Sequence, residues 1–308
     1  MHQVSARWRV PTIRASSGVG HASTWIGAQS AAGGYPFLQV GVTEDASGPG
    51  HDAYHAFWSD TAAGFHPQYM GALRAGDLVA VEMARTGESW RLSVDDLSRH
   101  RSLAKRVRYG AGAAFTQAEW LQEDPTAAPS VALDLPYPAM SDEAFSQVKV
   151  NGSTPRLALA NAQSLMATGG TILVPTSFRH DEFAMVAPTG AGKQYLSDVA
   201  PLDFAINTYN FEMARWGTRP PATKVSTVRA LVHAYAVFAD RLVAQDWPPT
   251  ARTDIAMLAS DDTRLNADLV AWQLSGLGRD TSEFVKLEDD QDNNLGQVVR
   301  QALGLPRV

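Results

Sequence analysis

Two polar side chains in strand-like segments could together hydrolyse an amide bond. Gln39 lies in the segment PFLQVGV, where every second residue is aliphatic and Gln39 falls on the opposite face. Glu119 lies in FTQAEWLQED and alternates with Trp120 in the same way. A carboxylate in a half-buried strand needs a partner or a purpose, because charged groups are costly to bury. If the two polar faces line one concave surface, the amide and the carboxylate converge.

The chemistry follows from the two groups. An ionised Glu119 takes a proton from water, which attacks the peptide carbonyl, while the Gln39 amide N–H donates to the developing oxyanion. The carboxylic acid formed in this step then protonates the leaving amine. A glutamate with the ordinary pKa of about 4.3 is ionised above that value and acidic enough to finish the reaction. We therefore expect an endopeptidase that works between about pH 3 and 5.

The elements that must position these residues are strands. Residues 1–188 contain short runs rich in Val, Ile, Trp, Phe and Tyr, separated by Gly, Pro, Asp and Ser. This pattern favours an antiparallel sandwich or barrel. The predicted strands are 5–13, 22–29, 36–43, 52–58, 77–84, 89–96, 115–123, 171–178 and 182–187.

From about residue 189 the hydrophobic period changes to that of helices. The segment PTGAGKQ (188–194) is interpreted as a linker, which divides the chain into domains 1–188 and 189–308. The apolar stripe from Val225 to Val243 is expected to pack on the sandwich or against a second copy, which makes a homo-oligomer through the C-terminal helices possible. The predicted helices are 202–216, 223–247, 260–278, which has a Ser/Asp cap, and 293–304.

Six motifs occur in an order that is typical of one known family. Over residues of about 4–188 the chain resembles the glutamic peptidases, or eqolisins. Each motif alone is weak, and the signal comes from their order and spacing. The motifs are ARWRVP (6–11), STWIGA (23–28), FLQVGV (37–42), YHAFW (54–58), RAGDLVAVE (74–82) and AEWLQEDP (118–125), with GGTILVPTSF (169–178) resembling the closing strand.

The resemblance implies a mainly β fold, with two antiparallel sheets in a sandwich of jelly-roll or concanavalin type, followed here by a small helical module. It implies a peptide-binding groove and a catalytic dyad that needs neither a metal ion nor another cofactor. By motif position the dyad is Gln39 and Glu119, and Trp25, Phe37 and Trp58 are candidate groove walls. The expected partner is a polypeptide substrate.

Two positions depart from the family pattern. Members commonly carry an acidic residue after the second motif and a glutamate in the aromatic strand, where this chain has Gln29 and Ser59. Loss of these supporting carboxylates could shift the working pH or abolish activity. An alternative function therefore stays open, in which a catalytically degenerate sandwich binds peptide or glycan without cleaving it.

Other candidate sites have simpler interpretations. Glu123 and Asp124 are expected at the solvated end of a strand. His51 and His55 would lie about 13 Å apart on a strand, which is too far for one zinc ion. The basic run 99–108 lacks interleaved aromatic residues and is interpreted as a solvated loop or hairpin face.

The composition excludes several partners. A formal net charge of −6 provides no general attraction to nucleic acid or to an anionic membrane. No window contains the roughly 18 consecutive apolar residues of a membrane span. The first residues lack the pattern of a signal peptide. The family resemblance leads us to expect secretion with a leader removed, and an intracellular location is the alternative.

Overall fold

The structure is a computed structural model of the chain. The two compact units of the chain are Met1–Ala158 with Ala167–Ala187, and Leu159–Met166 with Pro188–Val308. Residues 159–166 therefore group with the helical part, within the span that the sequence analysis assigned to the sandwich. The residues described are 1–15, 17–30, 36–61, 64, 66–108, 115–128, 131–134, 136–167, 170–277 and 293–306.

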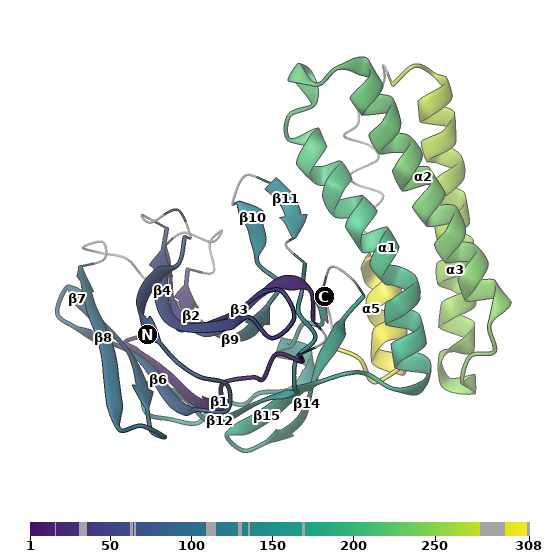
Figure 1. Cartoon of the computed structure of the whole chain (residues 1–308). Coiled ribbons are helices and arrows are strands. Elements are labelled where there is room, and N and C mark those ends of the chain that lie inside the picture. The colour runs from purple at the N-terminus through teal and green to yellow at the C-terminus, as the bar shows by residue number, and fades with distance from the viewer. Residues whose placement is uncertain are drawn as a thin grey trace. The chain divides into compact units, whose positions relative to one another are not determined.

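The larger sheet has eight strands in the order β13-β14-β15-β12-β1-β6-β7-β8, and the pairings from β14 to β8 are antiparallel (Figure 1). Its strands are β1 (Gln3–Arg9), β6 (Leu78–Thr86), β7 (Ser89–Asp96), β8 (Arg101–Arg108), β12 (Glu143–Val150), β13 (Leu165–Met166), β14 (Ile172–Arg179) and β15 (Glu182–Val186).

The smaller sheet has five antiparallel strands in the order β5-β4-β3-β2-β9 and carries the predicted dyad. A separate hairpin pairs the short strands β10 and β11. The strands are β2 (Val19–Gln29), β3 (Phe37–Ser47), β4 (Asp52–Asp60), β5 (Gln68–Ala72) and β9 (Gln117–Glu123), and the hairpin consists of β10 (Thr126–Ala128) and β11 (Val131–Asp134).

The space between the two sheets is filled by the aliphatic faces of the smaller sheet's strands. Ile26, Leu38 and Val40 are fully buried there. The Trp120 indole on the same face donates a hydrogen bond to the Ser5 carbonyl of β1, at 3.2 Å. This face therefore points toward the larger sheet, and the predicted two-sheet sandwich is confirmed. The alternate residues, which include Gln39 and Glu119, point to the outer face.

Each of the nine predicted segments contains a strand, and three longer strands were missed. Strand β8 occupies the basic run, and it forms a hairpin with β7 at the edge of the larger sheet. Most of its side chains are exposed, as the interpretation of a hairpin face requires. The strands β5 and β12 were not predicted, because their hydrophobic alternation is short or interrupted by polar residues.

The second unit contains long helices that lie side by side (Figure 1). Two sequence predictions need correction here. The segment interpreted as a linker contributes the first turn of a helix that starts at Gly190. The helix predicted to start at Ser260 starts at Pro249, since proline at the first helical position is pre-organised for the helical φ. The helices are α1 (Gly190–Met213), α2 (Pro221–Ala244), α3 (Pro249–Leu274) and α5 (Asn293–Ala302), with short 3-10 turns at Leu159–Asn161 and Trp216–Thr218.

The apolar stripe of α2 is buried within its own unit. Leu231, Tyr235 and Phe238 are at most 2% exposed, and α2 contacts both α1 and α3. Val243, at the end of the predicted stripe, is 76% exposed. The stripe therefore packs on neighbouring helices, and the homo-oligomer stays a prediction. Among the described residues, no helix has the length and apolar character to cross a membrane.

Two glutamate side chains among the described residues are buried in the sandwich, one from each sheet. Glu44 of β3 is 0% exposed and accepts a hydrogen bond from the Thr24 hydroxyl at 2.9 Å, and Glu143 of β12 is 2% exposed. Burial raises the pKa of both groups well above the usual range, and Glu44 raises the pKa of Glu143 further. The folded protein therefore favours the neutral form of both side chains.

We predict that these two groups make the sandwich less stable as the pH rises. In the unfolded chain they ionise near pH 4.5, whereas in the folded chain they keep their protons to higher pH. The native state then binds more protons, so the free energy of unfolding falls by about 1.4 kcal/mol per pH unit for each group above its unfolded pKa. Glu143→Gln should leave the melting temperature unchanged near pH 3.5 and raise it at pH 7.

The matched control is Glu182→Gln, which changes an exposed glutamate on the neighbouring strand β15. Thermal unfolding of the parent and both variants from pH 3 to 8 measures the effect. An equally steep loss of stability in the parent and in Glu143→Gln would show that Glu143 is ionised in the folded state.

Candidate active site

The pairing of the strands places the predicted dyad in one row across the smaller sheet. Glu119 of β9 pairs with Gly27 of β2, Gly27 pairs with Gln39 of β3, and Gln39 pairs with Ser59 of β4. Directly paired residues of an antiparallel sheet point to the same side. Gln39 and Glu119 therefore share the outer face, and two interstrand spacings separate their backbones by about 10 Å.

The residue between Gln39 and Glu119 is a glycine, and a tryptophan ring covers it. A Cβ atom on Gly27 would lie 2.6 Å from Cζ3 of Trp25, so no side chain fits at this position without moving the ring. Trp25 itself pairs with Gly41, where a Cβ would lie 2.2 Å from the Thr24 carbonyl oxygen. A side chain at Gly27 would collide with the Trp25 ring and one at Gly41 with the backbone of β2, so the structure requires a glycine at both positions.

Two buried polar atoms in this row have no hydrogen-bond partner among the described residues. They are Oε1 of Gln39, a side chain that is 7% exposed, and Oγ of Ser59, which is fully buried. Most buried polar atoms in proteins are paired, and unpaired ones often mark functional sites. The row thus holds polar groups that the described residues leave unsatisfied, as a site for a polar ligand requires.

The Glu119 carboxyl group has an unusual acidity. Burial and, as a smaller contribution, the negative charge of Glu123 together raise the pKa of Glu119 to about 7. The ordinary glutamate pKa expected from the sequence was therefore wrong. The main physical reason is burial of the carboxyl group, and the row around Glu119 holds Gly27, Gln39 and Ser59, none of which carries a positive charge that would stabilise the ionised form.

Glu123 is bonded within the sheet, in contrast to the predicted solvated strand end. Its Oε2 accepts a hydrogen bond from the Trp25 indole Nε1 at 2.7 Å and another from the Ser23 hydroxyl at 3.0 Å. The side chain is partly buried, as is that of Asp124. The sequence signal for this role was the spacing of four residues from Glu119, which places both carboxylates on one strand face.

The three predicted groove walls divide between the two faces. Trp25 and Phe37 lie on the dyad's face in an edge-to-face contact, with ring centroids 5.6 Å apart, and Phe57 and Leu121 pack with them. Trp58 pairs with Val40, so it lies on the face toward the larger sheet. Its prediction as a wall of the dyad's groove was wrong, because strand alternation places Phe57 and Ser59 on the dyad's face instead.

The inward face also explains what Trp58 does. The Lys105 ammonium of β8 lies 6.0 Å from the centre of its indole ring, a cation–π distance. Trp58 therefore connects the two sheets. The missed member of the aromatic cluster is Phe57, which the motif YHAFW contains directly before Trp58.

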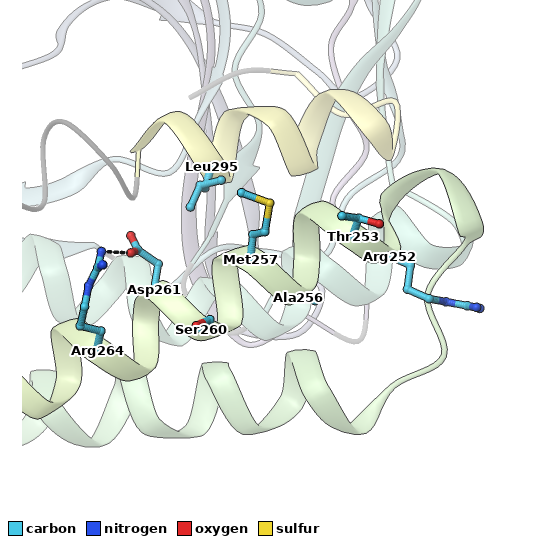
Figure 2. A pocket seen from close by; sticks show the side chains of 8 residues that line it. All are labelled: Arg252, Thr253, Ala256, Met257, Ser260, Asp261, Arg264 and Leu295. Atoms are coloured by element: carbon cyan, nitrogen blue, oxygen red, sulfur yellow. Dashed lines mark hydrogen bonds and ion pairs between the residues drawn. The ribbon is translucent and has the colours of Figure 1, made fainter.

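A separate pocket lies in the helical unit, between α3 and α5 (Figure 2). It has a volume of about 660 Å³. Met257 and Leu295 point toward each other across it, and Asp261 and Arg264 form an ion pair at one end. Arg252 is a third charged side chain in the lining, and Asp261 is the one carboxyl group among the lining residues, so the pocket offers no pair of groups suited to acid–base chemistry.

The chain belongs to the peptidase A4 family, whose model matches residues 1–187. This match confirms the resemblance drawn from the motif order, and the chain is a hydrolase of the glutamic peptidase type. The match ends close to the last strand of the sandwich, so residues 188–308 lie outside the family's model.

Solved structures of glutamic peptidases are similar to the sandwich. Scytalido-glutamic peptidase with a transition state analog inhibitor is 16% identical, with a TM-score of 0.47 over 60% of this chain and 91% of that chain. SCP-B, described as a member of the eqolisin family in complex with the tripeptide Ala-Ile-His, is 18% identical, with a TM-score of 0.45 over 60% and 90%. Aspergilloglutamic peptidase from Aspergillus niger is 20% identical, with a TM-score of 0.45 over 54% and 98%. The search of curated proteins found no match.

We predict that Glu119 titrates near pH 7 in the free protein. Burial of its carboxyl group disfavours the ionised form, so its proton is lost about two to three pH units later than from an exposed glutamate. Carboxyl-carbon NMR from pH 3 to 9 measures this, with Glu119→Gln identifying the resonance. A midpoint near 4.3 would contradict the burial seen in the structure.

Proposed function

We propose that the protein is an endopeptidase in which Gln39 and Glu119 form the catalytic dyad. The observation that carries the proposal is their common row, in which Gly27 separates them and both face outward. In the proposed mechanism the amide and the carboxyl group flank the position above Gly27, and a water molecule and a scissile carbonyl would bind between them. The polypeptide substrate would lie over the aromatic cluster of Trp25, Phe37 and Phe57.

The two members of the dyad have different tasks. The ionised Glu119 accepts a proton from the water molecule as its oxygen attacks the carbonyl carbon, and the carbonyl oxygen becomes an oxyanion. The Gln39 Nε2–H group donates a hydrogen bond to that oxyanion. The neutral Glu119 then returns the proton to the leaving nitrogen, the carbon–nitrogen bond breaks, and the acid and amine products leave.

The raised pKa of Glu119 changes the expected working pH. At pH 5, about one molecule in a hundred carries the ionised base when the pKa is about 7. A group with this pKa is also well matched to both halves of the reaction near neutral pH, because it accepts and returns a proton with little bias. We therefore propose that activity increases from pH 5 to pH 7, in place of the range of pH 3–5 expected from an ordinary glutamate.

Substitution of either dyad member should remove most of the activity. Gln39→Ala removes the oxyanion donor and should lower kcat by about 10²–10³. Glu119→Gln removes the base and should lower kcat/KM by at least about 10². Cleavage of a denatured protein substrate at several pH values between 3 and 8 measures both effects, and Glu182→Gln is the control with an exposed carboxylate. Parental rates in both dyad variants would refute the assignment.

The pH profile is a second and separate test. In the parent, kcat/KM should rise with pH and level off above about pH 7, because this parameter reports the pKa of the base in the free enzyme. The midpoint should agree with the NMR titration of Glu119. A profile that falls continuously from pH 4 to 7 would show that another group limits the reaction.

The alternative of a binding protein without activity has one observation in its favour. The position paired with Gln39 holds Ser59, whose hydroxyl cannot supply the charge of the glutamate that the family commonly carries there. If a peptide library binds to the protein between pH 3 and 8 and no cleavage is detected, the degenerate sandwich is favoured over the peptidase.

A further inference from the structure

The Trp25 indole has a fixed place in the row of the dyad. Its ring covers Gly27, since a Cβ on that glycine would lie 2.6 Å from Cζ3 and 3.2 Å from Cε3 of the ring. Trp25 is 4% exposed and packs edge to face on Phe37. These contacts hold the apolar part of the ring, and a single polar atom, the indole nitrogen, remains to be satisfied.

That nitrogen is bound by a carboxylate from the strand of Glu119. Nε1 of Trp25 donates to Oε2 of Glu123 at 2.7 Å, and the Ser23 hydroxyl donates to the same oxygen at 3.0 Å. Hydrogen bonds to a charged acceptor are short and roughly twice as strong as neutral ones. The strand pairing places Glu123 opposite Ser23, so the hydrogen bond from the Trp25 indole runs diagonally from β2 to β9.

We propose that Glu123 is a positioning residue of the active site, because it anchors the Trp25 indole over Gly27. The anchored ring is the floor between Gln39 and Glu119, and it keeps solvent from the sheet surface below the reacting groups. Glu123 touches no reacting atom and acts through the ring. The inference rests on the proposed function, since a floor matters for the rate only if the dyad above it reacts.

The negative charge of Glu123 also affects the pKa of Glu119. Glu123 lies two residues from Leu121 and four from Glu119 on one face of β9, and its charge raises the pKa of Glu119. The paired strands contribute no competing charge to the row itself, which holds Gly27, Gln39 and Ser59. The other titratable groups that the described residues place on this face are His21, Asp45, His55 and Tyr69.

Two substitutions distinguish the hydrogen bond that Glu123 accepts from the indole from the effect of its negative charge. Glu123→Gln keeps an oxygen that can accept the indole N–H, and it removes the negative charge. Glu123→Ala removes both. Both variants should move the midpoint of the kcat/KM profile, and of the Glu119 NMR titration, to lower pH by about half a unit to one unit. Only Glu123→Ala should lose the anchor, and its kcat on the plateau should fall at least about tenfold more than that of Glu123→Gln.

The indole N–H provides a readout that does not depend on activity. Its NMR resonance, assigned with Trp25→Phe, should stay protected from hydrogen exchange in Glu123→Gln and become unprotected in Glu123→Ala. Ser23→Ala is the matched control, because it removes the second donor to the same oxygen and leaves the indole bond. Its effect on kcat should be smaller than that of Glu123→Ala.

The outcomes distinguish the two proposals. Equal plateau kcat in the parent, Glu123→Gln and Glu123→Ala, with cleavage by the parent intact, would overturn the positioning role and leave the dyad standing. If Glu119→Gln cuts as fast as the parent, the dyad fails, and a positioning role for Glu123 in the reaction fails with it. In that case the exchange measurement still decides whether Glu123 anchors the indole. Loss of folding in Glu123→Ala, seen by circular dichroism, shifts the comparison to Trp25→Phe, which removes the same hydrogen bond and should reproduce the lower kcat.

Discussion

The register of three neighbouring strands is the constraint on which the active site depends. Because β9, β2 and β3 pair without a bulge at this row, Glu119, Gly27 and Gln39 lie side by side on the outer face. A slip of one residue would turn either dyad member into the apolar space between the sheets. The aliphatic residues that alternate with them prevent such a slip, since it would expose Ile26, Leu38 and Val40 to water. The hydrophobic core thus sets the geometry of a site that it does not touch.

Burial raises the pKa of Glu119, Glu44 and Glu143, and the consequences for activity and for stability have opposite pH dependence. In the proposed mechanism Glu119 must ionise to act as a base, and its raised pKa delays this until about pH 7. Glu44 and Glu143 are more stable in the neutral form, so an increase in pH weakens the sandwich around the site. We therefore expect the working range of the proposed enzyme to be a compromise between an ionised base and an intact fold.

The helical unit is organised around a core of its own. The stripe of α2 is covered by α1 and α3, and α5 adds the buried residues Val299 and Arg300. The Arg300 guanidinium lies 3.8 Å from the Asp203 carboxylate of α1 and above the Tyr195 ring. Its charge therefore has an ion-pair partner and a cation–π partner within the same unit. In the sandwich, Ile26, Leu38 and Val40 belong to a separate core between the two sheets.

Local patterns in the sequence were sufficient to predict most strands of the sandwich and the family of this protein. Alternation with a period of two predicted the strands and the faces of Gln39 and Glu119, and the motif order indicated the peptidase family. These properties are visible in sequence because they depend on residues that are neighbours along one strand or one helix. The stripe of α2 was found for the same reason, although its packing partners could not be inferred from it.

Only the tertiary structure decided the features that depend on contacts between distant strands. The row that joins Glu119 to Gln39, the indole bond of Glu123 and the inward position of Trp58 all follow from register, which no single segment encodes. The pKa of Glu119 also required the fold, because burial and the charge of Glu123 act through space. The start of α3 at Pro249 was missed because a later Ser/Asp pair offered an equally good cap, and packing along the whole helix favours the longer element.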